Sequence, residues 1–147
     1  MGLVACGESS GTGPTPAPGT DAAWASGTWV AVRLDGQPLP HRDAPTYPYL
    51  QTDSLKVSVL IIGTTRTASV YPYARSFFSA STTPTALGCG EALAPVTILS
   101  TSLSTSAVGA TTNIGGCNTN WVTMTLTRKA DSLAGTWLGR DIRLVKR

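Results

Sequence analysis

The sequence is poor in the side chains that carry most enzyme chemistry and metal binding. Its 147 residues include one histidine, three cysteines and eight Asp or Glu residues, and only 13% of the residues are charged. We therefore expect no catalytic centre, no cofactor, no metal site and no enzymatic activity. The single histidine, His41, follows Pro40 in a polar stretch, which indicates a solvated loop residue.

Long apolar runs and strong charge are also missing. No apolar run approaches the roughly 18–20 residues that a membrane-spanning helix requires. The net charge of +3 is small for a nucleic-acid-binding protein, so we expect no nucleic-acid partner. What the sequence does contain is 41% hydrophobic residues with abundant serine and threonine, too apolar for a disordered chain and too poor in Glu, Lys and Ala for a helical bundle. The length corresponds to one domain.

From residue 26 onward, the hydrophobic pattern alternates with a period of two, as in half-buried strands. The alternation is cleanest in residues 121–128, where Val122, Met124 and Leu126 alternate with threonines. Further strands are expected at residues 29–34, 55–62, 65–73, 95–100, 103–111, 133–138 and 141–145. No connection between them has the length and periodicity of a helical crossover, so the strands must be antiparallel. The sequence predicts an all-β domain, residues 26–147, folded as one antiparallel up-and-down β-barrel of about seven or eight strands, with a sandwich as the alternative.

Two irregular stretches, residues 37–49 and 76–94, interrupt this pattern, and aromatic residues gather in or near them. They are Tyr47, Tyr49, Tyr71, Tyr73, Phe77 and Phe78. If exposed, these side chains would form a rim that binds a partner or a carbohydrate; if buried, they would cap the mouth of the barrel.

Basic residues gather at the other end of the sequence. Six of the eleven lie between Arg128 and Arg147. They would attract an anionic surface such as phospholipid headgroups, or they would keep the edge of a terminal strand soluble.

The N-terminal sequence Leu3-Val4-Ala5-Cys6 resembles the lipobox of bacterial lipoproteins. In that family the cysteine sulfur receives a diacylglyceryl group and the preceding peptide is removed. The resemblance makes residues 1–5 the remnant of a signal peptide, Cys6 the lipidation site, and residues 6–25, rich in Gly, Ser, Thr and Pro, a flexible tether. Five residues are too few for the apolar segment of a signal peptide, so the expectation includes a start upstream of Met1. The alternative is a frayed terminus with an unrelated cysteine.

If Cys6 is lipidated, the two remaining cysteines form an even pair in an exported protein. Cys89 and Cys117 each lie among turn-forming residues, in loops that can bring two sulfur atoms together. We expect a disulfide that stabilises the fold by roughly 3–4 kcal/mol on the chain-entropy model. Two free thiols or a metal pair are the alternatives.

Gly27-Thr28-Trp29, at the start of the first expected strand, resembles the G-x-W signature of lipocalin-like barrels. In that family the tryptophan closes the barrel floor and an arginine from a late strand stacks on it, which the resemblance assigns to Arg140 or Arg143. The same Gly-Thr-Trp recurs at residues 135–137. This recurrence suggests two strands with a similar role, in which glycine permits close approach and tryptophan closes one end.

A late segment, Asn118-Thr119-Asn120-Trp121 followed by Gly139-Arg140-Asp141, is similar to the tail of avidin-type barrels, whose late tryptophan and aspartate contact biotin. Where avidins place polar ligand contacts, this chain has Val30, Ala31 and Val32, so the likeness concerns barrel geometry more than biotin binding. Together the two barrel resemblances give Trp29, Trp121, Trp137 and Asp141 as candidate ligand-binding residues.

The sequence thus predicts a lipid-anchored protein of the cell envelope, at the outer membrane and periplasm or at the cell surface. It would contact the membrane through its N-terminal lipid and act as a non-catalytic binding or structural module. Its partner would be a protein or a small hydrophobic ligand that the sequence does not identify. The alternatives are a lipocalin-like carrier of a small hydrophobic ligand and an inhibitor of a secreted hydrolase that acts through residues 76–94.

Overall fold

The computed structural model describes residues 22–80, 83–86, 90–112 and 119–147, which form short strands and two 3-10 helices. The helices are η1 (Ala23–Ala25) and η2 (Thr119–Val122). The strands are β1 (Gly27–Leu34), β2 (Gln37–Pro38), β3 (His41–Arg42), β4 (Tyr49–Ile62), β5 (Thr65–Phe77), β6 (Thr85–Ala86), β7 (Ala92–Ile98), β8 (Ser102–Thr105), β9 (Thr111–Thr112), β10 (Met124–Lys129), β11 (Ser132–Trp137) and β12 (Arg140–Lys146). In the described part of the chain, no helix is long and apolar enough to cross a membrane.

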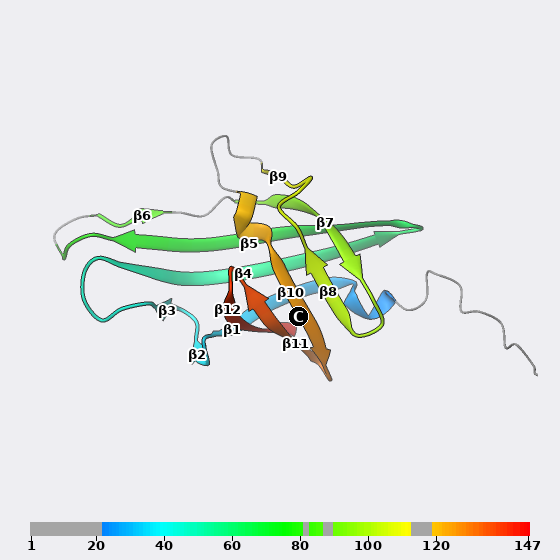
Figure 1. Ribbon diagram of the computed structural model, residues 1–147, viewed down its shortest axis with the longest axis horizontal. Coiled ribbons are helices and arrows are strands. Elements are labelled where there is room, and N and C mark those ends of the chain that lie inside the picture. The colour runs from blue at the N-terminus through cyan, green and yellow to red at the C-terminus, as the bar shows by residue number, and fades with distance from the viewer. Residues whose placement is uncertain (1–21, 81–82, 87–89, 113–118) are drawn as a thin grey trace, which may run out of the picture.

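Eight of these strands close into an antiparallel barrel (Figure 1). The strands β1, β4, β5, β7, β8, β10, β11 and β12 each pair with the next, and β12 returns to pair with β1. The short strands β2, β3, β6 and β9 pair at the margins. The all-β, up-and-down barrel expected from the alternating sequence is confirmed, and the sandwich alternative is not what forms.

Several strand boundaries differ from the expectation, and β4 begins at Tyr49, six residues before the expected start at Leu55. Strand β5 continues through Pro72, whereas the sequence predicted an end near this proline. On one side, β5 pairs with β7 up to Val70 and with β6 from Arg75 onward, so Pro72 has no paired strand on that side. Proline is tolerated at such an unpaired edge because no backbone N–H is needed there. Strand β8 ends already at Thr105, and Trp121 lies in η2 instead of opening β10.

Apolar side chains fill the interior of the barrel. The leucines at the centre of the inward-facing set, Leu55, Leu103, Leu126, Leu133 and Leu144, are all 0% exposed. Their alternation with exposed residues follows the period-two pattern of the sequence, since successive side chains of a strand point to opposite faces.

The two 3-10 helices lie at opposite ends of the barrel, which we call the η1 end and the η2 end. η1 leads into the start of β1, which pairs with the last part of β4. η2 leads into Met124, the first residue of β10, which pairs with the last residues of β8 and β11. Each helix packs into the barrel, because Ala25 of η1 and Val122 of η2 are both 0% exposed. Ala22, Trp24 and Ala25, within the stretch that the sequence analysis assigned to the tether, therefore pack with the core.

The β4–β5 hairpin is longer than the barrel wall and projects from the η2 end as an arm (Figure 1). β1 pairs with β4 only over residues 56–59, and β7 pairs with β5 only over residues 67–70. Beyond these pairs, β3 and β6 flank the hairpin. We define the arm as residues 47–54 and 72–78 with β3 and β6.

Candidate functional site

Trp29 and Trp137 occupy matching positions at the two ends of the barrel. Each is 2% exposed. The indole Nε1 of Trp29 donates to the carbonyl of Ala25 in η1 at 2.9 Å, and that of Trp137 donates to the carbonyl of Trp121 in η2 at 2.8 Å. Edge-to-face packing adds a second tryptophan at each end, Trp24 at 6.3 Å from Trp29 and Trp121 at 5.8 Å from Trp137 between ring centroids. Each Gly-Thr-Trp segment thus supplies the tryptophan that holds a 3-10 helix across one end.

The cation on Trp29 is a lysine. Lys146 places its Nζ 5.4 Å from the centroid of the Trp29 ring and donates to the carbonyl of Trp24 at 3.1 Å. The expectation that Arg140 or Arg143 stacks on Trp29 is wrong, because the pairing of β1 with β12 sets Lys146 opposite Trp29. Arg140 begins β12 at the other end of the barrel.

The four candidate ligand-binding residues do not line one cavity. Trp121 and Trp137 contact each other at the η2 end, whereas Trp29 lies at the η1 end. The exposed Asp141 pairs with Thr136 on the outer side of the wall, and its backbone N–H donates to the Asp35 carboxylate at 3.1 Å. In this arrangement Trp29 and Trp137 close the two ends of the barrel. At the positions that resemble lipocalin-like and avidin-like motifs, these tryptophans therefore have a structural role.

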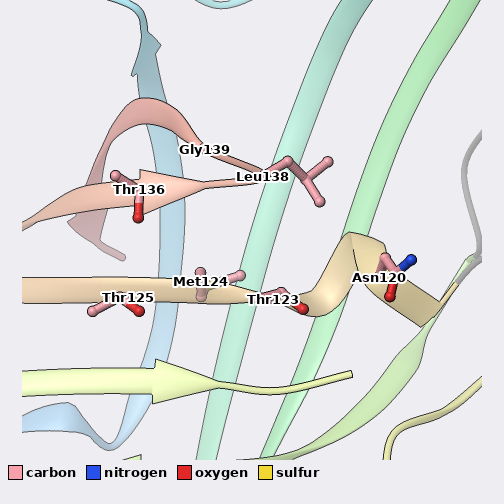
Figure 2. Close-up of a pocket in the computed structure, with 7 residues that line it drawn as sticks. All are labelled: Asn120, Thr123, Met124, Thr125, Thr136, Leu138 and Gly139. Carbon is pink, nitrogen blue, oxygen red and sulfur yellow. The ribbon is translucent and has the colours of Figure 1, made fainter. Parts of the chain in front are cut away.

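A hollow of about 310 Å³ opens on the outer wall beside this tryptophan pair. Figure 2 shows its lining side chains, which come from η2, the start of β10, the end of β11 and the following turn. They are Asn120, Thr123, Met124, Thr125, Thr136, Leu138 and Gly139. The lining is uncharged and mostly apolar, so the hollow offers a ligand apolar contact with Met124 and Leu138 beside threonine hydroxyl groups, and no group that would attract an ion.

Arg140 ties the base of the arm to the barrel. Its guanidinium lies 2.7 Å from carboxylate oxygens of both Asp35, after β1, and Asp43, after β3. The backbone N–H of Asp43 donates to the carbonyl of Leu50 in β4 at 2.9 Å. His41 lies 4.0 Å from Asp43 and belongs to β3 with its side chain 17% exposed, so the prediction of a solvated loop residue is wrong.

The outer face of the arm carries a stack of aromatic rings. Tyr49 of β4 pairs across the hairpin with Phe77 of β5, and their ring centroids are 4.7 Å apart with an interplanar angle of 18°. The ring of Tyr47 lies 5.0 Å from that of Tyr49. Arg42 of β3 covers Tyr49 at 4.4 Å from its centroid. The six aromatic residues therefore do not cap the barrel mouth, which η2 closes.

A two-point ion pair fixes the same face. Arg75 donates from Nε and Nη2 to the two carboxylate oxygens of Asp53, both at 2.7 Å, and it lies 5.5 Å from the ring of Phe77. The Arg75 hydrogen bonds hold the pKa of Asp53 below its ordinary value, against the opposing effect of partial burial, and the amide of Gln51 contributes in the same direction. Arg75 itself has a raised pKa for the same reason. A planar guanidinium held in this way is preorganised for contact with a partner.

We expect Asp53→Asn to loosen this ion pair in a pH-dependent manner. Because the pKa of Asp53 is lowered in the folded protein, its contribution to stability is present above the pKa of the unfolded chain and is lost as the pH falls through the folded-state value. The variant should therefore be less stable than the wild type at neutral pH, with a difference that shrinks on acidification. Urea unfolding at several pH values measures this. Asp131→Asn, at an exposed turn, should show a smaller difference at neutral pH.

Three aromatic side chains on the arm are open to solvent. Tyr47 and Tyr73 are each 43% exposed and Phe78 is 64% exposed. Sequence reasoning singled out these aromatics but missed Arg42 and Arg75. Arg75 could have been found from its spacing, because it lies midway between Tyr73 and Phe77. In a strand that continues past Pro72, all three side chains lie on one face.

Three residues of predicted sites lie outside the described residues. They are the lipidated Cys6 and the two cysteines of the predicted disulfide, Cys89 and Cys117. Within the described residues, no group of three or more His, Cys, Asp or Glu side chains is arranged to hold a metal ion.

The fold is a small closed antiparallel β-barrel of eight strands, an architecture consistent with that of lipocalin-like and avidin-like barrels. Comparison of the chain with protein-family models, with curated proteins and with solved structures returns no match.

Proposed function

We propose that the protein is a lipid-anchored envelope protein that binds a protein partner through the outer face of its arm, without catalysis. The observation that carries the proposal is the arm itself. Tyrosine and arginine are enriched at the centres of protein–protein contacts, and here both types lie together on a projecting hairpin.

The arm is suited to binding because it is rigid before any partner arrives. The Tyr49–Phe77 stack and the Arg75–Asp53 ion pair fix its face, and Arg140 holds its base to the barrel. Preorganised side chains lose little conformational freedom on association, which lowers the cost of binding. The exposed aromatic rings then supply the apolar area that a partner covers.

The proposed anchor and the arm leave the barrel at opposite ends. Residue 22, the first described one, joins η1, whereas the arm projects at the η2 end (Figure 1). A lipid on Cys6 would hold the η1 end near a membrane and direct the arm away from it. This arrangement supports the lipobox interpretation of Leu3-Val4-Ala5-Cys6, because a binding arm on the membrane side would be obstructed.

The packed interior favours binding on the outside over a lipocalin-like carrier. Inward-facing positions carry leucines, valines and the two closing tryptophans, each nearly or fully buried, where a carrier would keep a space for its ligand. If this protein inhibits a secreted hydrolase, that function is a special case of the proposal, because the hydrolase would be the protein partner that the arm binds.

Photo-crosslinking in the native host tests this function. A benzophenone amino acid replaces Phe78 on the arm, and in a matched control it replaces Leu93, 49% exposed on the outer wall of β7. We expect a discrete adduct from position 78 that is much stronger than any from position 93, with peptides of a second protein in the adduct. The same cells receive a clickable fatty acid, which should label the wild type and not Cys6→Ala.

Each outcome decides one element of the proposal. Equal crosslinking from positions 78 and 93 would argue against the arm as the binding surface. An adduct without peptides from a second protein would indicate a glycan and contradict a protein partner. Failure of the fatty acid to label the wild type would remove the lipid anchor.

A further inference from the structure

We propose that the η1 end of the barrel lies directly against an anionic phospholipid bilayer. The inference rests on the proposed lipid anchor, which would bring this end to a membrane, and it adds a second, protein-made contact. This end combines positive charge, exposed apolar side chains and a half-buried tryptophan.

Charge is distributed unevenly between the two ends of the barrel. Arg128, Lys129, Lys146 and Arg147 lie at the η1 end, where β10 and β12 terminate, and Asp131 in the β10–β11 turn is the acidic residue of the described chain beside them. Asp35, Asp43, Asp53 and Asp141 all lie at the η2 end or on the arm. Arg128, Lys129, Lys146 and Arg147 form no ion pair with a described residue, whereas the η2 end holds several ion pairs. The free positive charge therefore faces the anchored side.

Large apolar side chains project at the same end. Leu60 and Ile62, before the β4–β5 turn, are 56% and 66% exposed, and Leu99, in the β7–β8 turn, is 60% exposed. The two turns are neighbours, because Arg66 after the first turn donates to the carbonyl of Ile98 before the second at 3.0 Å. Exposed leucine and isoleucine on turn tips at this basic end of the barrel suit the boundary between lipid headgroups and acyl chains.

Trp24 joins these parts into one surface. Its indole Nε1 donates to the carbonyl of Leu99 at 3.1 Å, and its own carbonyl accepts from Lys146. The guanidinium of Arg128 lies 5.4 Å from its ring. A half-buried tryptophan between cations and apolar tips is typical of residues at the membrane interface, whose rings sit at the headgroup level.

The combination of cations and exposed apolar side chains at the η1 end favours a bilayer over other anionic partners. An acidic polysaccharide would be attracted by the cations alone, and the exposed Leu60, Ile62 and Leu99 would have no use in that contact. A bilayer uses both, since anionic headgroups attract Arg and Lys while the interface accepts apolar side chains.

Vesicle sedimentation with the full chain carrying Cys6→Ser, which cannot be lipidated, isolates the protein-made contact. The probes are vesicles of phosphatidylcholine with and without phosphatidylglycerol. We expect binding only to the anionic vesicles, weakened by salt. Replacing Arg128, Lys129 and Arg147 by glutamine should lower the partition coefficient about 100-fold, from about fivefold per charge. Replacing Leu60, Ile62 and Leu99 by serine should weaken the binding that persists at high salt.

The matched control removes two charges from the walls of the barrel. It replaces Arg33 and Lys56, which pair within strands β1 and β4, by glutamine. It should lose much less binding than a second variant in which Arg128 and Lys129 at the η1 end are replaced by glutamine. Equal losses in these two double variants, equal binding to neutral vesicles, or stronger binding to an acidic polysaccharide would each overturn the inference. Vesicle binding without fatty-acid labelling in cells would contradict the anchor and leave the membrane-binding end intact, whereas labelling without vesicle binding would do the reverse.

Discussion

Replacing Gly135 by alanine should destabilise the barrel by at least about 3 kcal/mol, a large part of the stability of a domain of this size. Gly135 of β11 pairs with Leu126 of β10, and the two backbones approach so closely that a Cβ atom has no room. A Cβ built on Gly135 would lie 2.0 Å from the carbonyl oxygen of Thr125 and 2.9 Å from the Cα of Leu126. These are backbone atoms of a paired strand, so relief requires β10 and β11 to separate. Urea unfolding followed by circular dichroism measures the loss.

Gly139→Ala is the control for this prediction. Gly139 also needs glycine, because its φ of 76° lies in the left-handed region, but a Cβ there would meet nothing within 4 Å. Its replacement should cost about 1–2 kcal/mol from backbone strain alone. If Gly135→Ala is no more destabilising than Gly139→Ala, then the close approach of β10 and β11 does not determine stability.

The barrel itself could be predicted because its cause is local. Each inward-facing side chain alternates with an outward one, so Met124 and Leu126 indicate their strand without any knowledge of its neighbours. The paired Gly-Thr-Trp segments were informative for a similar reason. Glycine and tryptophan at a fixed spacing place a close approach and a bulky closing residue on one strand, and Gly135 and Trp137 show both.

The arm could not be predicted because it depends on partners that are distant in the sequence. Residues 37–49 contain several prolines and show no alternation, and the strand they lead into is extended by pairing with β5 and, over two residues, with β3. Pro72 suggested an end to β5, and only the absence of a second neighbour at that point allows the strand to continue. The Arg75–Asp53 ion pair joins the two strands of the hairpin, and nothing near either residue indicates the other.

The choice of cation at the η1 end has the same origin. Arg140, Arg143 and Lys146 all lie on the last strand, and which of them meets Trp29 is set by the register of β1 against β12. That register shifts between Ala31 and Arg33, an irregularity that has no signature in the sequence. The type of residue on the tryptophan could therefore be predicted, as a cation from a late strand, but its identity could not.

Trp137→Ala should lower the free energy of unfolding by about 3–5 kcal/mol. The side chain is 2% exposed, and removing it leaves a cavity beneath η2 that the closed wall cannot fill by collapse. The loss includes the indole hydrogen bond to the carbonyl of Trp121. Trp137→Phe should cost less, because a ring still fills most of the space. Trp24→Ala, which removes a half-buried tryptophan at the other end, is the control and should also cost less.

The double variant Trp29→Ala, Trp137→Ala tests whether the two ends close independently. The residues lie at opposite ends of the barrel and contact different helices, so their losses should add within about 0.5 kcal/mol. Circular dichroism is the suitable probe, because the substitutions remove two of the four tryptophans and so change the fluorescence signal itself. Losses that add would establish η1 and η2 as separate closures of one barrel. A double variant much less destabilised than the sum would mean that the first substitution already loosens both ends.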